Sequence, residues 1–190
     1  MNNTPSTADA AGTRVWQQII SIRRWVDKEE RIDDSLEALT MRVMEIGEYY
    51  GETCEALLAT NTGDGDELVK ALCDVVLAAG VALCTADHEA QEAFVDSLAW
   101  NEHTGKETIG RLVLKLGQEH GAASEALLNV TAYRSRKGAP QTMADVVAKL
   151  CAVVRAAAES LHRVDSAAEE TFTATLELAY NRSLGVVRLA

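Results

Sequence analysis

Acidic side chains recur along one stretch of the chain at spacings of three and four residues. Glu45, Glu48, Glu52 and Glu55 would share one face of a helix there, because a helix turns by about 100° per residue. Asp74 stands inside an otherwise apolar segment, where a buried acid needs a partner. Carboxylates on two facing helices can offer oxygen donors to Mg²⁺. A solvated charged face is the alternative interpretation of the glutamates.

The charge of the chain is unevenly distributed. Residues 1–103 carry 20 acids and 7 bases, whereas residues 104–190 carry 9 acids and 11 bases. The first half is therefore the half expected to bind cations, although simple pairing of an acidic face with a less acidic one would give the same distribution. The sequence has no basic stripe that could neutralise phosphates, so we expect no DNA binding.

The elements that must position these acids are expected to be helices. The 190 residues include only two prolines and are 47% apolar, which favours an all-α fold, a helical bundle. The apolar run 75–84 is too short to span a membrane, and the polar start lacks the apolar core of a signal peptide. We therefore expect a cytoplasmic protein that does not enter a membrane. Buried, reduced thiols are expected for Cys54, Cys73, Cys84 and Cys151.

The chain contains an internal repeat. Residues 48–58 align without gaps onto residues 118–128, which lie 70 positions further along. Residues 72–76 align onto 150–154 at a separation of 78, and this separation also relates Asp87 to Asp165 and Phe94 to Phe172. The additional residues of the second copy fall in its loop, 133–141.

Each copy is predicted to contain a long helix, a loop, a second long helix and a shorter third helix, for which Asp87 and Asp165 are the expected N-caps. The first copy spans 14–103 and includes an additional amphipathic helix over about 14–27, and the second copy spans 104–190. Residues 1–13 are expected to be flexible. Because short connections make helices pack as antiparallel neighbours, the two copies should share one core about a pseudo-two-fold axis.

Two segments of the first copy resemble a known family. The pattern Glu-x-x-Gly-Glu-x-x-Glu-Ala of residues 48–56 precedes Ala-Leu-Cys-Asp-Val-Val of residues 71–76. Together they are similar to the Glu-Glu-x-x-Glu, loop, Glu-x-x-Asp signature of the MazG-like nucleoside triphosphate pyrophosphohydrolases. In the second copy the loop 134–138 resembles the Arg-Lys-Gly loop of bacterial members. The resemblance covers roughly residues 14–185 and implies a bundle of two tandem MazG-like repeats.

The resemblance implies a site for Mg²⁺ or Mn²⁺. In the family the metal clamps a triphosphate and activates water, which releases a nucleoside monophosphate and pyrophosphate. The matching catalytic positions here are Glu48, Glu52 and Asp74. Tyr49 and Ala71 replace the other two acids of the signature, and Glu45 is a candidate to replace a lost ligand. The implied metal ligands are Glu45, Glu48, Glu52 and Asp74.

The second copy has lost more of the signature. Only Glu119 matches a family acid, and Lys149 stands where another is expected. A cation at that position repels a metal ion, so the second copy is expected to be metal-free. The candidate substrate-binding residues, for the phosphates, are Arg134, Arg136 and Lys137, with an exposed basic loop as the alternative. The side chains of Trp16, Trp25 and Trp100 could either stack on a nucleotide base or anchor the core.

These observations lead to two functional hypotheses. The first is a nucleotide pyrophosphohydrolase with a degenerate, single asymmetric metal site. The second is a catalytically inactive MazG-like regulatory or assembly subunit, which binds a nucleotide or a protein partner and can form a homo-oligomer. Because both copies have lost ligands, the sequence favours a weakened or lost activity. A helical interaction module without any ligand is a third interpretation.

Overall fold

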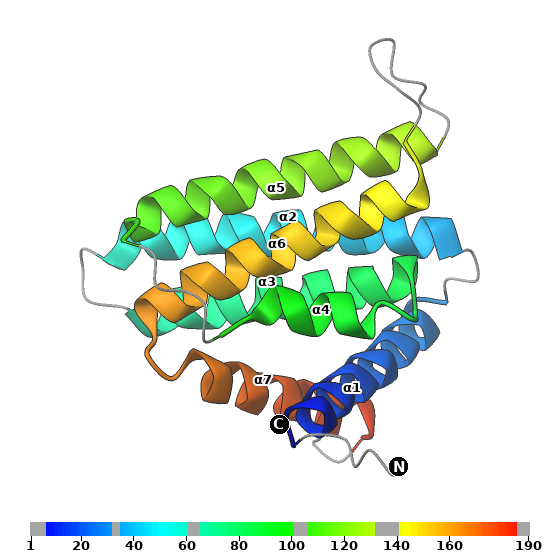
Figure 1. Ribbon diagram of the computed structural model, residues 1–190, viewed down its shortest axis with the longest axis horizontal. Coiled ribbons are helices and arrows are strands. Elements are labelled where there is room, and N and C mark those ends of the chain that lie inside the picture. Colours follow the sequence, from blue (N-terminus) through cyan, green and yellow to red (C-terminus); the bar gives the residue numbers. More distant parts are fainter. Residues whose placement is uncertain (1–6, 32–34, 61–64, 101–105, 132–140, 186–190) are drawn as a thin grey trace, which may run out of the picture.

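The computed structural model describes residues 7–31, 35–60, 65–100, 106–131 and 141–185, and these residues form helices with no strand among them (Figure 1). The prediction of an all-α helical bundle is confirmed. The helices in chain order are α1 (Thr7–Glu30), α2 (Ser35–Ala59), α3 (Gly65–Ala86), α4 (Gln91–Leu98), α5 (Ile109–Val130), α6 (Met143–Val164) and α7 (Ala168–Ser183). Helix α1 extends beyond both ends of the predicted range 14–27, and the predicted boundary between the copies lies outside the described residues.

Four long helices form the centre of the molecule. The hairpins α2–α3 and α5–α6 pack against each other, chiefly through α3 and α6 and at a second contact between α2 and α5. Helix α3 is the central helix, with apolar side chains buried along most of its length. Its length and hydropathy alone would allow it to cross a membrane, but 72% of its most apolar window is buried within the bundle. The core helix of a helical bundle produces the same pattern.

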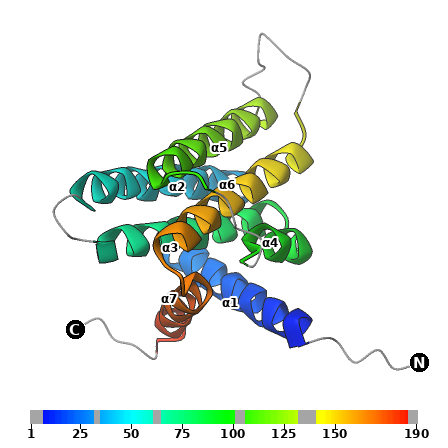
Figure 2. The same cartoon turned by 60° about the vertical axis from the view of Figure 1, so that its left-hand side comes forward.

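The remaining helices cover one side of this bundle. Helix α4 packs along α6, whereas α7 packs mainly on α1 and touches α3 and α6 less extensively. Figures 1 and 2 both show α1 and α7 together on the side away from α5. The third helix of each copy therefore contacts the second helix of the other copy, and α1 makes the two sides unequal.

The contact between α2 and α5 is reciprocal. A Cβ atom on Gly47 would lie 3.0 Å from Cε1 of His120, and one on Gly117 would lie 2.6 Å from Cζ of Tyr50. Gly47 and Gly117 are equivalent in the repeat, and so are Tyr50 and His120. Each copy thus supplies one glycine and one ring to the crossing. A pseudo-two-fold axis between the copies produces this arrangement.

The two aspartates expected as N-caps act one turn earlier than predicted. Asp87 Oδ1 accepts a hydrogen bond from the backbone N–H of Glu89 at 2.9 Å, and Asp165 Oδ1 accepts one from Ala167 at 2.8 Å. The residues that directly precede α4 and α7 are alanines without a side-chain cap. The prediction was wrong in its detail because each aspartate stabilises a turn before the helix. The two turns are nevertheless alike, as the repeat requires.

The cysteines differ in burial. All four are free thiols; Cys73 and Cys84 are buried, whereas Cys54 and Cys151 are only half-buried. The prediction of burial is therefore confirmed for two of the four. Cys151 is less enclosed than its equivalent Cys73, which lies on the central helix.

Candidate functional site

A pocket of about 400 Å³ lies between α1, α2, α3 and α7. It brings together Glu45 of α2 and Asp74 of α3, two of the residues that the sequence singled out. Most of its wall is apolar, because α1 and α7 contribute aliphatic and aromatic side chains where they close over the bundle. The apolar lining includes Ile22, Trp25, Val26, Leu77, Val81 and Leu178. Trp25, with 39% of its surface exposed, stands at the opening.

Asp74 is held by a lysine on its own helix. The ammonium Nζ of Lys70 lies 2.9 Å from Oδ2 of Asp74, one helical turn away. The Asp74 side chain is 20% exposed, and the hydrogen bond to its carboxylate raises the pKa of Lys70. The partner that a half-buried acid requires is thus supplied by the protein itself. Lys70 also lies within electrostatic reach of Glu52 and Arg182.

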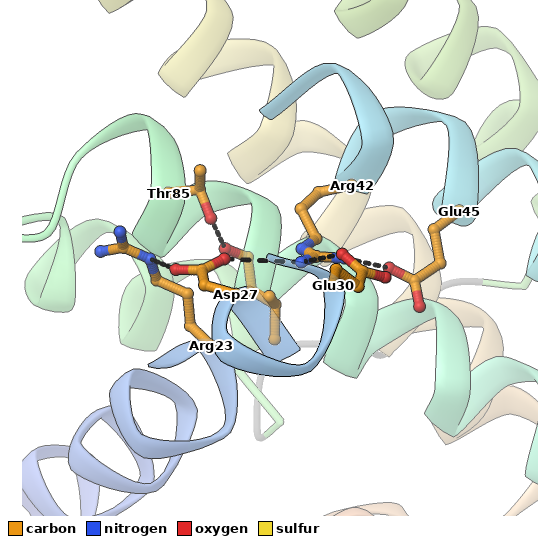
Figure 3. Close-up of polar contacts among 7 residues, drawn as sticks. Arg23, Asp27, Glu30, Arg42, Glu45 and Thr85 are labelled. Carbon is orange, nitrogen blue, oxygen red and sulfur yellow. Dashed lines mark hydrogen bonds and ion pairs between the residues drawn. The ribbon is translucent and has the colours of Figure 1, made fainter. Parts of the chain in front are cut away.

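Glu45 belongs to a network of charges around a buried arginine (Figure 3). The side chain of Arg42 is 1% exposed, and its guanidinium lies 2.6 Å from Glu30, 3.4 Å from Asp27 and 3.5 Å from Glu45. Burial alone would lower the pKa of Arg42, but its hydrogen bond and charge interaction with Glu30 more than compensate, so this pKa is raised. Burial raises the pKa of Glu45, and the nearby Arg42 opposes that effect.

This network fixes one wall of the pocket. Asp27 and Glu30 lie at the end of α1, so their ion pairs with Arg42 tie α1 to α2. Asp27 is itself held by Arg23, whose Nε lies 3.0 Å away. The buried Nε of Arg42 has no hydrogen-bond partner among the described residues. The last turns of α1 supply three of the apolar lining residues, and the ion pairs set their position.

Tyr49 lies among the predicted acids. Burial, as the largest cause, and the charges of Glu45, Asp74, Glu52 and Glu48 together raise the pKa of its phenol to about 12. The phenol is therefore protonated at neutral pH and can donate a hydrogen bond. Tyr49 stands where the MazG-like pattern has its middle glutamate, and it lines the pocket.

The other two predicted ligands point to solvent. Glu48 and Glu52 are exposed, as is Glu55, which is the alternative of a solvated charged face. Within the part of the chain that the structure describes, no group of three or more His, Cys, Asp or Glu side chains could hold a metal ion. The four predicted ligands therefore do not form a set that fits a divalent cation, because two are exposed and the other two pair with cations.

Lys70, Thr175 and Arg182 were missed by sequence reasoning. The Lys70 spacing to Asp74, four residues on a helix, was a signal for an ion pair. No motif pointed to Thr175 or Arg182, which come from α7 and line the pocket beside the residues of the predicted site. Arg182 is exposed and makes no ion pair with any described carboxylate.

In the second copy a base replaces the acid Glu45. Lys115 stands at the position of Glu45 and pairs with Glu159 at 2.8 Å. Glu119 and Lys149 are half-buried. The predicted phosphate-binding residues Arg134, Arg136 and Lys137 lie outside the described residues.

Two of the three tryptophans anchor the core. The ring of Trp16 lies 5.4 Å from that of Phe94, and the ring of Trp100 lies 5.9 Å from that of Phe172. The two phenylalanines are equivalent in the repeat. Only Trp25 reaches the pocket.

Comparisons with protein-family models, with curated proteins and with solved structures found no match to this chain.

Proposed function

We propose that this chain is a MazG-like protein that binds a nucleotide in the pocket between α1, α2, α3 and α7 without hydrolysing it. One observation carries the proposal: both acids that face the pocket are already paired with cations of the protein. Asp74 pairs with Lys70 and Glu45 with Arg42. A carboxylate engaged in this way offers less charge to compensate the dehydration of Mg²⁺.

The lining of the pocket supports binding of a nucleotide. Ligand sites are typically concave and mostly apolar, with a few polar groups that converge. Trp25 offers an aromatic face on which a base can stack, and Arg182 offers a cationic fork for a phosphate. The wall also carries a donor, the phenol of Tyr49, beside the carboxyl group of Glu45.

The proposal is tested by measuring binding and turnover on the same samples. Isothermal titration calorimetry with nucleoside mono- and triphosphates should detect binding, while a pyrophosphate-release assay with Mg²⁺ or Mn²⁺ should give no signal above background. Ala179→Trp, which places a ring in the pocket wall, should abolish the binding. Release that increases in proportion to enzyme concentration would disprove the non-catalytic function.

A nucleoside triphosphate pyrophosphohydrolase is the second candidate. It is favoured by one observation, that Glu45 and Asp74 reach the pocket from α2 and α3, the two helices that carry the MazG-like pattern. In that case Asp74→Asn should abolish pyrophosphate release, whereas Glu119→Gln in the second copy should leave most of it. Loss of release in Glu119→Gln alone would exclude this assignment of the site.

The assembly and location of the protein are proposals from the sequence. We propose a cytoplasmic protein that forms a homo-oligomer or binds a protein partner. Light scattering coupled to size-exclusion chromatography tests whether the protein forms a homo-oligomer. A mass equal to that of one chain would exclude the homo-oligomer.

A further inference from the structure

The charges on the pocket wall cancel one another. Two acids, Glu45 and Asp74, and two bases, Lys70 and Arg182, line the pocket. Lys70 and Asp74 form an ion pair at 2.9 Å, and Glu45 is engaged by Arg42 from behind the wall. Arg182 is the one base of this lining that has no ion pair with a described carboxylate. The pocket therefore has a single cationic group free to meet a ligand.

A single free guanidinium suits a ligand with one anionic group. Arginine binds a phosphate, sulfonate or carboxylate through two parallel hydrogen bonds, and one such fork satisfies one anionic group. A triphosphate brings several negative charges into the same space, and there Asp74 and Glu45 would repel the charges that Arg182 does not neutralise. Binding a triphosphate would require a metal ion, or the release of Lys70 from Asp74.

The rest of the wall suits a planar apolar body. Trp25 and Leu178 are among the exposed large apolar side chains of the protein, and both line this pocket. Leu77 and Val81 form the floor on α3. Apolar walls of this kind gain free energy by removing an apolar ligand from water.

The polar groups that remain can recognise one edge of that body. The Tyr49 phenol donates a hydrogen bond, and the Glu45 carboxyl group beside it accepts one. Thr175 Oγ1 donates to the carbonyl oxygen of Thr171 at 3.0 Å, so this hydroxyl can still accept a hydrogen bond.

We infer that the pocket selects a planar, largely apolar ligand with a single anionic group, bound by Arg182 without a divalent cation. This inference rests on the proposed function and narrows it: among nucleotides, a nucleoside monophosphate fits and a triphosphate does not. The second copy and the exposed Glu48 and Glu52 have no part in this binding.

The test uses the full-length protein and two kinds of probe. The first is 8-anilinonaphthalene-1-sulfonate, whose planar naphthalene ring carries one sulfonate, and its binding is followed by fluorescence. The second is a set of nucleosides with their mono- and triphosphates, whose binding is titrated by calorimetry. Each titration is done with EDTA and again with roughly 5 mM Mg²⁺, a concentration that saturates a weak magnesium site. Arg182→Gln is the test variant, and Arg155→Gln, an exposed arginine on α6 away from the pocket, is the matched control.

The inference expects the naphthalene sulfonate and at least one monophosphate to bind equally well with Mg²⁺ and with EDTA. The triphosphate should bind more weakly than its monophosphate. Arg182→Gln should weaken both anions about tenfold or more, the usual loss when a hydrogen bond to a charged group is removed, and should leave the nucleoside unchanged. Arg155→Gln should bind like the wild type. Ala179→Trp should block every probe; if this variant does not fold, Leu178→Glu at the exposed edge should repel the anions instead.

Three results would overturn the inference: a triphosphate that binds more tightly than its monophosphate in Mg²⁺, equal binding by Arg182→Gln and wild type, or no binding of the sulfonate to the folded protein. Arg182-dependent binding of the sulfonate with no binding of any nucleotide would uphold the inference and refute the proposed nucleotide function. Pyrophosphate release by a protein that still prefers monophosphates would refute only the non-catalytic function.

Discussion

Thr175 on α7 lies close enough to the thiol of Cys73 on α3 to oppose the rise in its pKa that burial causes, and this contact joins the two copies of the repeat. In the counterpart contact, Ser97 on α4 opposes the same effect of burial on the pKa of Cys151 on α6. Cys73 and Cys151 are equivalent in the repeat, and so are Ser97 and Thr175. Each copy therefore donates its third helix to the other at the same place. These contacts in the structure thus support the alignment of the two copies, which was made from the sequence alone.

The first prediction concerns the reactivity of Cys73. Burial, which Thr175 only partly offsets, raises the pKa of its thiol to about 11. The thiolate is the reactive form. Cys73 should therefore resist a maleimide at a pH of about 7.5, which is about one pH unit below the ordinary thiol pKa. Site-resolved mass spectrometry should find Cys54 and Cys151 labelled before Cys73, because these two are only half-buried. Labelling of Cys73 as fast as Cys54 in the native protein would contradict the structure; in denaturant both should react.

The second prediction uses the glycines of α5. Gly117→Ala should destabilise the protein by about 1 to 2 kcal/mol, because the added Cβ forces the ring of Tyr50 to move. Gly121→Ala is the control on the same helix: its Cβ would meet no atom within 4 Å, so alanine should stabilise the helix by about 0.5 to 1 kcal/mol. Urea unfolding followed by circular dichroism measures both. Equal effects of the two substitutions would argue against the close crossing of α2 and α5.

The third prediction concerns the buried arginine. Arg42→Met should cost roughly 2 to 3 kcal/mol of unfolding free energy, because it leaves Asp27, Glu30 and Glu45 without their common cation. The acids keep partial contact with water, which limits the loss. Arg14→Met is the control, since its ion pair with Glu177 is exposed and should contribute less than about 1 kcal/mol. Thermal unfolding of both variants beside the wild type measures the difference, and comparable shifts would show that Arg42 has no special role.

The fourth prediction is a pH dependence at Glu45. The pKa of Glu45 is raised in the folded protein, so the folded state binds its proton more tightly than the unfolded chain does. The stability from this group is fully present below the ordinary glutamate pKa of 4.5 and is lost as the pH rises through the folded pKa. Glu45→Gln does not titrate there. The melting temperature of the wild type minus that of Glu45→Gln should therefore fall as the pH rises above 4.5. A difference that grows over this range would mean that Arg42, not burial, dominates.

The helices of the core could be predicted from the sequence because burial imposes a period on it. Leu68, Leu72 and Val75 recur at three- and four-residue spacing, and all are buried in α3. The ends of α1 could not be predicted as well. The aspartates before α4 and α7 were predicted to be N-caps, but each stabilises a turn ahead of its helix, and the pattern of apolar residues does not reveal that turn.

The site was only partly predictable. The sequence selected Asp74 by its MazG-like pattern and Glu45 by the helical spacing of its acids, and these two residues do share a pocket. It could not tell that Glu48 and Glu52 face solvent, because the pocket forms where α1 and α7 cover α2 and α3, near Glu45. Helix α1 has no counterpart in the second copy. A comparison of the two repeat sequences therefore could not predict that α1 covers α2 and α3 at this place. Arg182 lies on α7, where no motif marked it.

Because the third helix of each copy packs on the other copy, neither repeat forms a complete core by itself. Helix α4 covers α6 of the other copy, and α7 rests on α1 and α3. If the chain were cut between the copies, each fragment would expose an apolar face that the third helix of the other copy covers in the intact protein. The fragments should therefore fold only when both are present and associate with each other. Removing either repeat would therefore expose apolar surface on the repeat that remains.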